Sequence, residues 1–345
     1  MDLIHPHSAD AVATALSEAS RDGARVLLVG GRTQMGRGNP AEVDAELWTT
    51  LLDRVIAYEP DEMIAVAEAG VRVGELRRVL AEGGQEWPVD ADDEATVGGV
   101  VAAGADSVRQ LGVGLLRDTV VEVEAATGDG RRIRSGARVV KNVTGFDLHR
   151  LLTGSLGTLA CLTQIAVKVR PLPRATCTLV TTEGGLELGR RLLDEVQGLV
   201  SVLAEPDHVR LRLEGWPREV EAQTAAVKAI AAAEVDDGPF PPPVFPQAAV
   251  VVEAGVVPSK LPDLLDGAGG FRALMGVGTA WVPFDDPDGL TLFRARATDL
   301  GGVAPAVRGP GGLGEAPVAA VDVQRRVKAA FDPAGILAPG RGWTT

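Results

Sequence analysis

The spacing of apolar residues in the first half of the chain changes between helix-like and strand-like intervals. Apolar side chains recur every three or four residues along Ala9–Ala19, which predicts a helix that Ser8 can cap and Gly23 ends. The uninterrupted apolar run Val26–Val29 then predicts a buried strand. The same criteria predict strand pairs at Arg54–Tyr58 with Met63–Ala69 and at Thr119–Thr127 with Arg131–Arg134, helices at Val73–Gly83 and Asp147–Leu152, and a long strand at Leu159–Val169.

Two prolines interrupt this pattern, and the character of the chain changes after them. Pro171 and Pro173 follow the long strand, so we place a domain boundary at residue 172. We predict an α+β fold with a first domain at 1–172, a smaller α+β domain at 173–320 and a C-terminal segment at 321–345. The later elements are predicted as strands at Thr176–Thr182, Leu199–Leu203, Val209–Leu213, Ala249–Glu253, Thr279–Val282 and Val303–Val307 and helices at Leu186–Gln197, Arg218–Glu234, Ser259–Leu265, Leu290–Leu300 and Val321–Ala330.

A glycine-rich loop follows the predicted strand Val26–Val29. Residues 30–38 read GGRTQMGRG, which is rich in glycine and has one hydroxyl. Glycine adopts positive φ readily, so consecutive backbone N–H groups can converge on an anion. The loop therefore predicts a site for a phosphate or a pyrophosphate.

A second stretch of small residues occupies Thr96–Ala105, where no side chain is larger than valine. Such a segment allows the backbone to lie flat against a large planar ligand. A tightly packed helix explains the same composition, so both interpretations stay open. The acidic run Asp90–Glu94 that precedes it is predicted to be a solvated loop and no metal site.

Composition and charge narrow the class of protein. A net charge of −13 over 345 residues argues against nucleic-acid binding, which needs a basic face. Residues 1–7 lack the basic and apolar regions of a signal peptide, and there is no run of about 18 uncharged apolar residues that would cross a membrane. The two cysteines, Cys161 and Cys177, fit a reducing cytoplasm, and Cys161 is predicted to be a core residue.

The motifs of several common enzyme classes are missing from the sequence. The dinucleotide fingerprint G-x-G-x-x-G, the Walker loop and the G-x-S-x-G elbow are all absent. The four histidines show no metal-ligand spacing, so we expect no metal site. A phosphate-binding loop therefore remains without a nicotinamide, nucleoside-triphosphate or hydrolase signature.

Taken together, these segments resemble the FAD-binding domain of the vanillyl-alcohol-oxidase-type (PCMH-type) flavoproteins. That family usually has a third glycine where this chain has Arg32. The resemblance implies a two-subdomain PCMH-type FAD-binding domain at 1–172, a small α+β cap domain, and a C-terminal segment that returns to the FAD domain. The motifs that carry the resemblance are, in order, Val29–Gly36, Glu68–Leu76, Thr96–Ala102, Gly112–Asp118, Gly154–Leu159 and Phe331–Arg341.

The resemblance also implies how FAD is held. Backbone N–H groups of Gly30–Met35 would bind the pyrophosphate, small residues at 97–99 would approach the flavin, and the backbone of Leu162 would bind the adenine. Arg32 either adds charge or is simply an exposed arginine. We expect non-covalent FAD, because residues 30–38 lack the histidine found in covalently flavinylated relatives. The candidate FAD-binding residues are Gly30, Gly31, Arg32, Thr33, Gln34, Met35, Gly36, Pro88, Thr96, Val97, Gly98, Gly99, Ala102, Ala103, Arg117, Asp118 and Leu162.

Within that family, the segment Val140–Leu148, which reads VKNVTGFDL, is similar to the GlcE-type subunits of bacterial glycolate oxidases. This resemblance implies oxidation of glycolate or a related D-2-hydroxy acid in a complex with a second FAD subunit and an iron–sulfur subunit. It also implies a cytoplasmic location, or one at the inner membrane through that complex. The candidate catalytic residues are Lys141, Asn142 and Arg341, which would stabilise a substrate carboxylate or an anionic reduced flavin; the alternative for Lys141 is a loop residue that binds neighbouring carbonyls.

Two other functions remain open. Full-length relatives that oxidise D-2-hydroxy acids have a larger cap domain and a metal-binding histidine pair, and this chain has neither. A non-catalytic FAD-binding or assembly subunit is therefore the alternative. A reductase of the UDP-acetylenolpyruvoylglucosamine type shares the FAD domain, but the lysine–asparagine segment at 141–142 argues against it.

Overall fold

A computed structural model describes residues 1–138, 146–238, 240, 245, 247–310, 312–314 and 321–342. These residues form two compact units. Unit 1 comprises the described parts of Met1–Asp106, Leu115–Leu172 and Glu315–Thr345, and unit 2 comprises those of Ser107–Gly114 and Pro173–Gly314. The segment Ser107–Gly114, which lies inside the range of the first predicted domain, thus groups with unit 2. The α+β fold class is confirmed, because each unit combines helices with β-sheet.

The glycine loop of unit 1 follows the last residue of a strand in a short parallel sheet. Among the described residues its strands run in the order β1 (Asp2–Ile4), β3 (Ala45–Trp48) and β2 (Val26–Val29). Helix α1 (Ala9–Asp22) begins where Ser8 Oγ accepts a hydrogen bond of 3.1 Å from the Ala11 amide, and its apolar face shares one core with β2, β3 and the larger sheet of this unit. The predicted helix and the predicted strand β2 are therefore confirmed, whereas β1 and β3 were missed.

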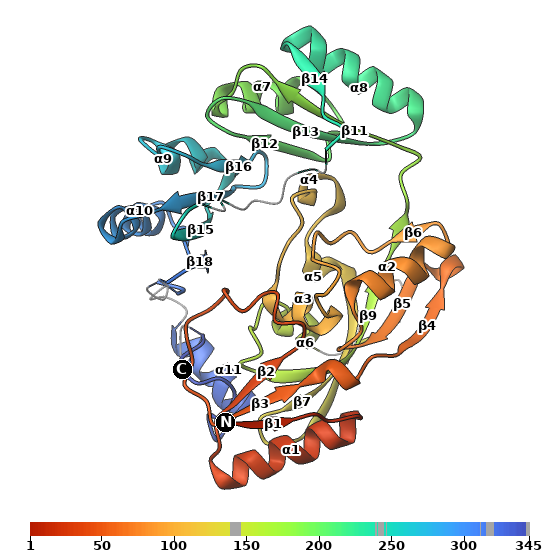
Figure 1. Cartoon of the computed structure of the whole chain (residues 1–345), viewed down its shortest axis with the longest axis vertical. Coiled ribbons are helices and arrows are strands. Elements are labelled where there is room, and N and C mark those ends of the chain that lie inside the picture. The colour runs from red at the N-terminus through yellow and green to blue at the C-terminus, as the bar shows by residue number, and fades with distance from the viewer. Residues whose placement is uncertain are drawn as a thin grey trace. The chain divides into compact units, whose positions relative to one another are not determined.

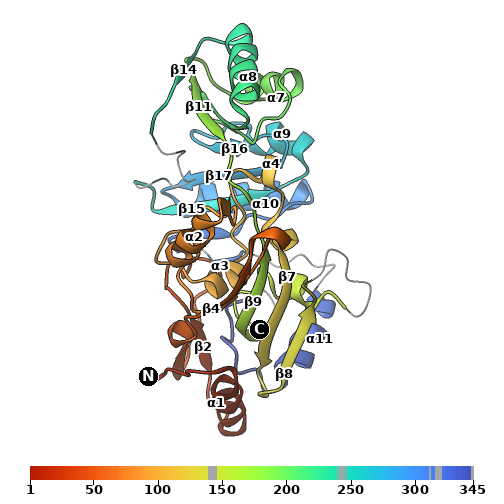
Figure 2. The ribbon, with the colours of Figure 1, turned by 90° about the vertical axis from the view of Figure 1, so that its right-hand side faces the viewer.

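An antiparallel sheet forms the larger part of unit 1 (Figure 1). In the described ranges its strand order is β4-β5-β9-β7-β8, so the two predicted strand pairs lie on either side of the long strand β9. Figure 2 shows β7, β8 and β9 side by side. Helices α2 and α3 share the apolar core of this sheet. The bounds are β4 Val55–Glu59, β5 Ile64–Glu68, β6 Gln85–Glu86, β7 Val120–Thr127, β8 Arg132–Gly136, β9 Ala160–Lys168, β10 Arg170–Pro171, α2 Val73–Glu82, α3 Val97–Ala103, α5 Leu116–Thr119 and α6 Leu148–Leu152, with short 3-10 helices at Thr49–Leu51 and Pro60–Glu62.

The C-terminal segment of unit 1 runs beside the glycine loop's own strand. After helix α11 (Val321–Phe331), the Val26 amide donates to Ile336 O and the Ala338 amide donates to Val26 O, each at 2.8 Å. The buried Lys328 ammonium pairs with the Asp332 carboxylate at 2.7 Å and donates to Leu337 O at 2.8 Å. These contacts bring the last described residues next to the loop.

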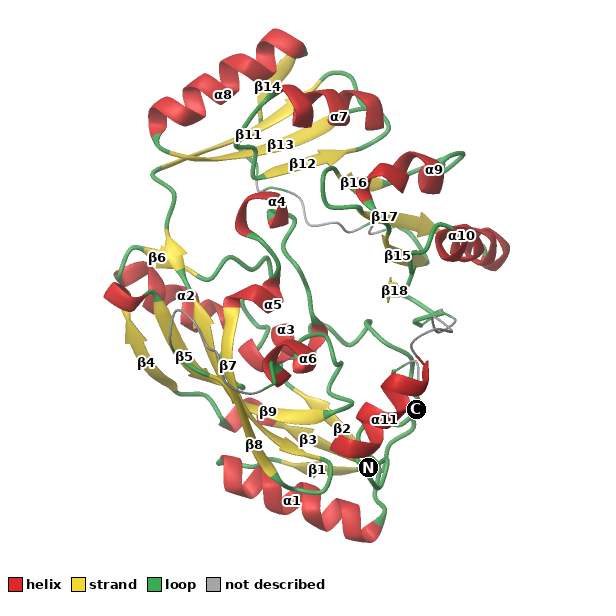
Figure 3. Ribbon diagram, turned by 180° about the vertical axis from the view of Figure 1, so that it is seen from behind, coloured by secondary structure: helices red, strands yellow, loops and turns green. Residues whose placement is uncertain are grey.

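Unit 2 has an antiparallel sheet of its own, with eight strands in its described part in the order β14-β11-β13-β12-β16-β17-β15-β18. Figure 3 shows α7 and α8 along one face of β11, β12 and β13, and all four longer helices contribute to the same core. The bounds are β11 Ala175–Thr181, β12 Ser201–Ala204, β13 Val209–Gly215, β14 Ala233–Val235, β15 Val250–Gly255, β16 Arg272–Leu274, β17 Thr279–Phe284, β18 Ala306–Arg308, α4 Gln110–Val113, α7 Leu186–Glu195, α8 Pro217–Ile230, α9 Leu261–Leu265 and α10 Pro287–Asp299, with a 3-10 helix at Pro258–Lys260.

The predicted helix Arg218–Glu234 was wrong at its C-terminal end. Helix α8 stops at Ile230, and Ala233–Val235 form the edge strand β14, which pairs with β11. Pairing to an open sheet edge outweighs the helix preference of a few alanines, because local propensity is the weaker effect. No helix in the described part of either unit is long and apolar enough to cross a membrane.

Candidate functional site

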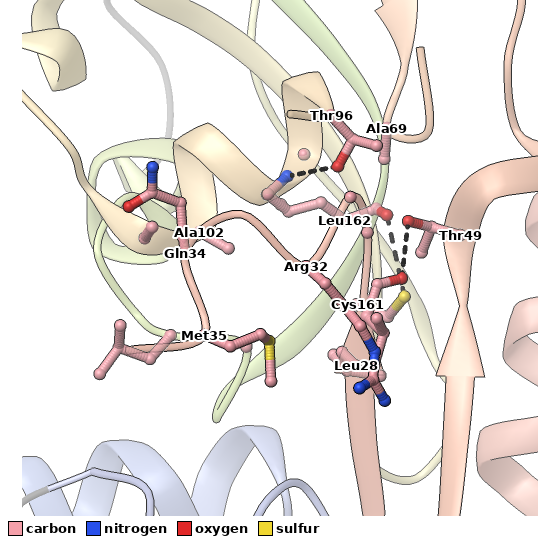
Figure 4. A pocket seen from close by; sticks show the side chains of 18 of the residues that line it. Leu28, Arg32, Gln34, Met35, Thr49, Ala69, Thr96, Ala102, Cys161 and Leu162 are labelled. Atoms are coloured by element: carbon pink, nitrogen blue, oxygen red, sulfur yellow. Dashed lines mark hydrogen bonds between the residues drawn. The ribbon is translucent and has the colours of Figure 1, made fainter. Parts of the chain in front are cut away.

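A pocket in unit 1 collects residues from segments that are far apart in the sequence. It is open to solvent and lies where the glycine loop meets α3 and β9 (Figure 4). Most of its described lining residues are small or apolar. They are Leu28, Val29, Gly30, Gly31, Arg32, Thr33, Gln34, Met35, Thr49, Ala69, Thr96, Gly98, Gly99, Ala102, Ala103, Leu156, Gly157, Ala160, Cys161, Leu162 and Arg341.

The first two glycines of the loop are required by close packing. A Cβ atom at Gly30 would overlap the hydroxyl of Thr96 and lie 3.3 Å from its Cβ. A Cβ atom at Gly31 would overlap the carbonyl oxygen of Glu94. Thr96 is buried, and its hydroxyl accepts a hydrogen bond of 3.2 Å from the Gly99 amide, which caps α3 (Figure 4). The loop and the small-residue helix are therefore fitted directly against each other.

The loop presents backbone amides that the protein itself does not use. Within the described part of the chain, the amides of residues 31–34 donate no hydrogen bond to another protein group. Backbone N–H groups near a pocket need a partner, and here that partner is a solvent molecule or a ligand. The arrangement fits the anion site that the glycine pattern predicts.

Arg32 has a positive φ of 58°, in the left-handed region that favours glycine. Its guanidinium pairs with the buried carboxylate of Glu46, and its Cζ lies 4.9 Å from the ring centroid of Trp48. The indole Nε1 of Trp48 donates a hydrogen bond of 3.0 Å to the same carboxylate. Both residues belong to β3, so the sheet holds the Arg32 side chain in place.

Arg341 is the second cationic residue that lines the pocket. It is only 7% exposed, and burial lowers the pKa of its guanidinium below the usual value. Its Nη2 donates to the Met35 carbonyl at 3.4 Å, and its own carbonyl accepts from the Asn39 amide at 3.0 Å. The structure therefore places the Arg341 side chain against the glycine loop.

The pocket brings together most of the candidate FAD-binding residues. The exceptions among the described residues are Gly36, Pro88, Val97, Arg117 and Asp118, which do not line it. Pro88 and Val97 are buried in the core, Gly36 and Arg117 are exposed, and Asp118 forms an ion pair with Arg150. Of the candidate catalytic residues, Arg341 lines the pocket, whereas Lys141 and Asn142 lie outside the described residues.

Several lining residues were missed, since their positions depend on long-range packing. Thr49 Oγ1 donates to Val29 O at 3.3 Å from the 3-10 helix after β3 (Figure 4). Ala69 and Gly157 belong to motifs that carry the resemblance, so the motif positions were a usable signal for them. Cys161 faces the pocket edge from β9, where burial raises the pKa of its thiol to about 12. The described residues contain no cluster of three or more His, Cys, Asp or Glu side chains that could hold a metal ion.

The site and its fold can now be compared with known proteins. Residues 3–136 match the protein family described as FAD binding domain. The N-terminal part of the chain belongs to the PCMH-type FAD-binding domain family. The pocket's loop, its helix α3 and the strands that support them fall almost entirely within this FAD-binding domain.

Curated relatives of the FAD-binding domain include subunits of glycolate oxidases and D-lactate dehydrogenases. Glycolate oxidase subunit GlcE of Escherichia coli is 39% identical over 36% of this chain and 37% of its own length. A D-lactate dehydrogenase of Archaeoglobus fulgidus is 31% identical over 50% of this chain and 39% of its own. The aligned region therefore covers well under half of the length of each of these two relatives. An uncharacterized FAD-linked oxidoreductase of Mycobacterium tuberculosis is 26% identical over 97% of this chain and 89% of its own.

A solved structure of alkyldihydroxyacetonephosphate synthase has the same fold. The match has a TM-score of 0.71 at 14% identity and covers 98% of this chain and 75% of the other. Identity this low supports the fold alone.

The residues of the pocket suit FAD. Glycines and alanines leave room for a planar ring system, uncommitted amides at 31–34 suit a diphosphate, and a buried cation lies beside them. The described lining residues come from six stretches of the sequence, namely 28–35, Thr49, Ala69, 96–103, 156–162 and Arg341. The site thus joins segments from both ends of unit 1.

Proposed function

We propose that this chain is an FAD-binding oxidoreductase subunit of a complex that oxidises glycolate or a related D-2-hydroxy acid. In this proposal its partners are a second FAD subunit and an iron–sulfur subunit, and the complex works in the cytoplasm or at the inner membrane surface. The observation that carries the proposal is the 39% identity to GlcE, together with a pocket that suits FAD and takes most of its lining residues from the aligned family domain.

The roles of the chain's residues in this proposal follow from the pocket. When bound, FAD supplies hydride and single-electron transfer chemistry. The amides of residues 31–34 would bind the diphosphate, and the absence of side chains at Gly98 and Gly99 would let the ring system lie close to α3. Leu162 lines the pocket beyond the last β5–β9 pair, Glu68 with Gln164, and in this proposal its backbone would bind the adenine.

We also propose that FAD is held without a covalent bond and that Lys141 and Asn142 stabilise a substrate carboxylate or an anionic reduced flavin. The first proposal rests on the absence of histidine from residues 30–38 and from the lining residues that the structure describes. Acid precipitation tests it directly, because non-covalent FAD stays in the supernatant. A yellow pellet would overturn it.

The decisive experiment for the function is anaerobic reduction of the purified flavoprotein. The oxidised protein should absorb near the flavin bands, and glycolate or D-lactate should bleach them when the partner subunits are present. Bleaching in the isolated chain would assign the substrate site to this subunit alone. A chain that binds FAD but is never bleached, even in the complex, would favour the non-catalytic subunit, and bleaching by NADPH would favour the reductase.

A further inference from the structure

Two arginines line the pocket, and they are its only charged side chains among the described lining residues. A diphosphate carries negative charge, so either guanidinium could in principle meet it. Their surroundings differ in one decisive respect, which is whether a carboxylate already compensates the positive charge.

The charge of Arg32 is already compensated. Its guanidinium pairs with Glu46, whose side chain is 5% exposed, and it stacks on Trp48. A buried carboxylate that lost this partner would remain uncompensated, which is strongly unfavourable. Arg32 is therefore committed to Glu46, and the pair stabilises the left-handed backbone at residue 32.

Within the part of the chain that the structure describes, the charge of Arg341 has no such partner. Among the described residues no carboxylate lies within ion-pair distance of it, and its side chain makes one long hydrogen bond, to the Met35 carbonyl. A guanidinium has five N–H donors, so most of its donor capacity is unused. A buried cation is costly unless it is paired, and an anionic ligand in the pocket would supply the pairing group.

We propose that Arg341 supplies the positive charge that binds the diphosphate of FAD, while Arg32 is a positioning residue held by Glu46. The carbonyl that Arg341 contacts belongs to Met35, and a Cβ atom at Gly38 would lie 3.1 Å from the Arg341 Cγ. The guanidinium thus lies against the same loop whose amides at 31–34 are uncommitted. Amides and guanidinium together form an anion site with a charge, and its ligand class is an organic diphosphate. This inference rests on the proposed FAD binding.

The test compares two variants that each remove one guanidinium from the pocket. Arg341→Gln should weaken FAD binding by about tenfold or more and flatten its dependence on salt, since one phosphate contact is lost. The comparison variant is the double variant Arg32→Gly with Glu46→Gln, which leaves no carboxylate unpaired, suits the positive φ and keeps the amide of residue 32. We expect it to lose less FAD affinity than Arg341→Gln and to keep a salt dependence like that of the wild type.

FAD affinity is measured by quenching of flavin fluorescence in titrations of the apoprotein, with ADP as a second probe that has the diphosphate but no flavin. Arg341→Gln should weaken ADP binding in parallel. Equal FAD affinity in the wild type and in Arg341→Gln would overturn this inference but not the proposed function. This conclusion would hold even if the variant were reduced more slowly by glycolate. A wild-type chain that takes up no FAD would overturn the proposed function as well.

Arg341→Lys keeps the test decisive if the glutamine variant does not fold. Lysine retains the charge but loses the fork geometry, so we expect a loss of less than about tenfold and a salt dependence like that of the wild type. A larger loss in a lysine variant of normal thermal stability, or a flattened salt dependence, would show that packing and not charge accounts for the role of Arg341.

Discussion

Gly30→Ala is the most direct perturbation of the contact between the glycine loop and α3. The added Cβ would overlap the Thr96 hydroxyl and lie 3.3 Å from Thr96 Cβ and 3.5 Å from its Cγ2. Thr96 is 1% exposed, so it cannot turn into solvent. Either the hydroxyl gives up its hydrogen bond to the Gly99 amide, or the loop moves away from the helix.

The size of the effect follows from these two outcomes. Loss of an N-cap hydroxyl costs about 1 kcal/mol, and overpacking of a buried contact costs about 1–3 kcal/mol. We expect the free energy of unfolding to fall by about 2–4 kcal/mol if the loop stays in place. If the loop moves instead, the strain appears in FAD binding, where about 1.4 kcal/mol corresponds to a tenfold weaker Kd.

Urea denaturation of the apoprotein and flavin fluorescence titration together measure both outcomes. Gly269→Ala is the matched control, because nothing lies within 4 Å of a Cβ atom there and its φ is not positive. We expect this control to change the free energy of unfolding by less than about 0.5 kcal/mol. The double variant Gly30→Ala with Thr96→Ala should be little worse than Thr96→Ala alone, since the overlapping oxygen is gone.

A wild-type result in both assays for Gly30→Ala would refute the reasoning. It would mean that residue 30 and Thr96 do not approach as closely as the structure places them. A double variant whose loss equals the sum of the two single losses would show that the alanine acts elsewhere than on Thr96.

Three further predictions concern other parts of unit 1. Lys328→Met leaves the buried Asp332 carboxylate without its cation, and it should lower the free energy of unfolding in urea by about 3 kcal/mol; a loss below about 1 kcal/mol would contradict this. Burial lowers the pKa of His149 from 6.5, so protonation opposes folding, and stability should fall as the pH drops below about 6.5. His149→Gln should lessen that fall between about pH 7.5 and 5.5, and an unchanged pH slope in denaturation would refute the prediction. Lys141→Met should slow anaerobic flavin reduction by substrate in stopped-flow measurements by about tenfold or more while FAD affinity stays constant; a loss of FAD affinity would place Lys141 in cofactor binding instead.

Local chemistry made much of unit 1 predictable. The strand pairs were found because Pro60 and Asp61 in one case, and Gly128–Gly130 in the other, are typical turn residues between apolar runs. The glycine loop was predicted because glycine readily adopts the positive φ that allows consecutive backbone amides to converge on an anion. The two interpretations of Thr96–Ala105 are compatible, since α3 is a packed helix whose glycines and alanines also line the pocket.

The rest of the site depends on contacts that no local pattern records. Strands β1 and β3 have three and four residues, too few for a period to be read. Because β3 is not predicted, the sequence does not indicate that Glu46 lies beside Arg32. This ion pair nevertheless determines whether the charge of Arg32 is compensated. Thr49 and Cys161 reach the pocket for the same reason, because parallel pairing and sheet packing join distant segments.

Because the whole chain is acidic, the diphosphate site depends on how the arginines near it are arranged. A protein with a net charge of −13 repels an anionic ligand on average, so a diphosphate site needs positive potential close at hand. Arg32 cannot provide it while Glu46 compensates its charge, but it can hold a left-handed backbone position that glycine would otherwise occupy. Arg341 comes from the opposite end of the chain, anchored through Val26 and Leu337, and no carboxylate among the described residues compensates its charge. In our proposal the parallel pairing of the C-terminal segment with β2 is therefore part of the anion site, since this contact brings the Arg341 guanidinium to the loop.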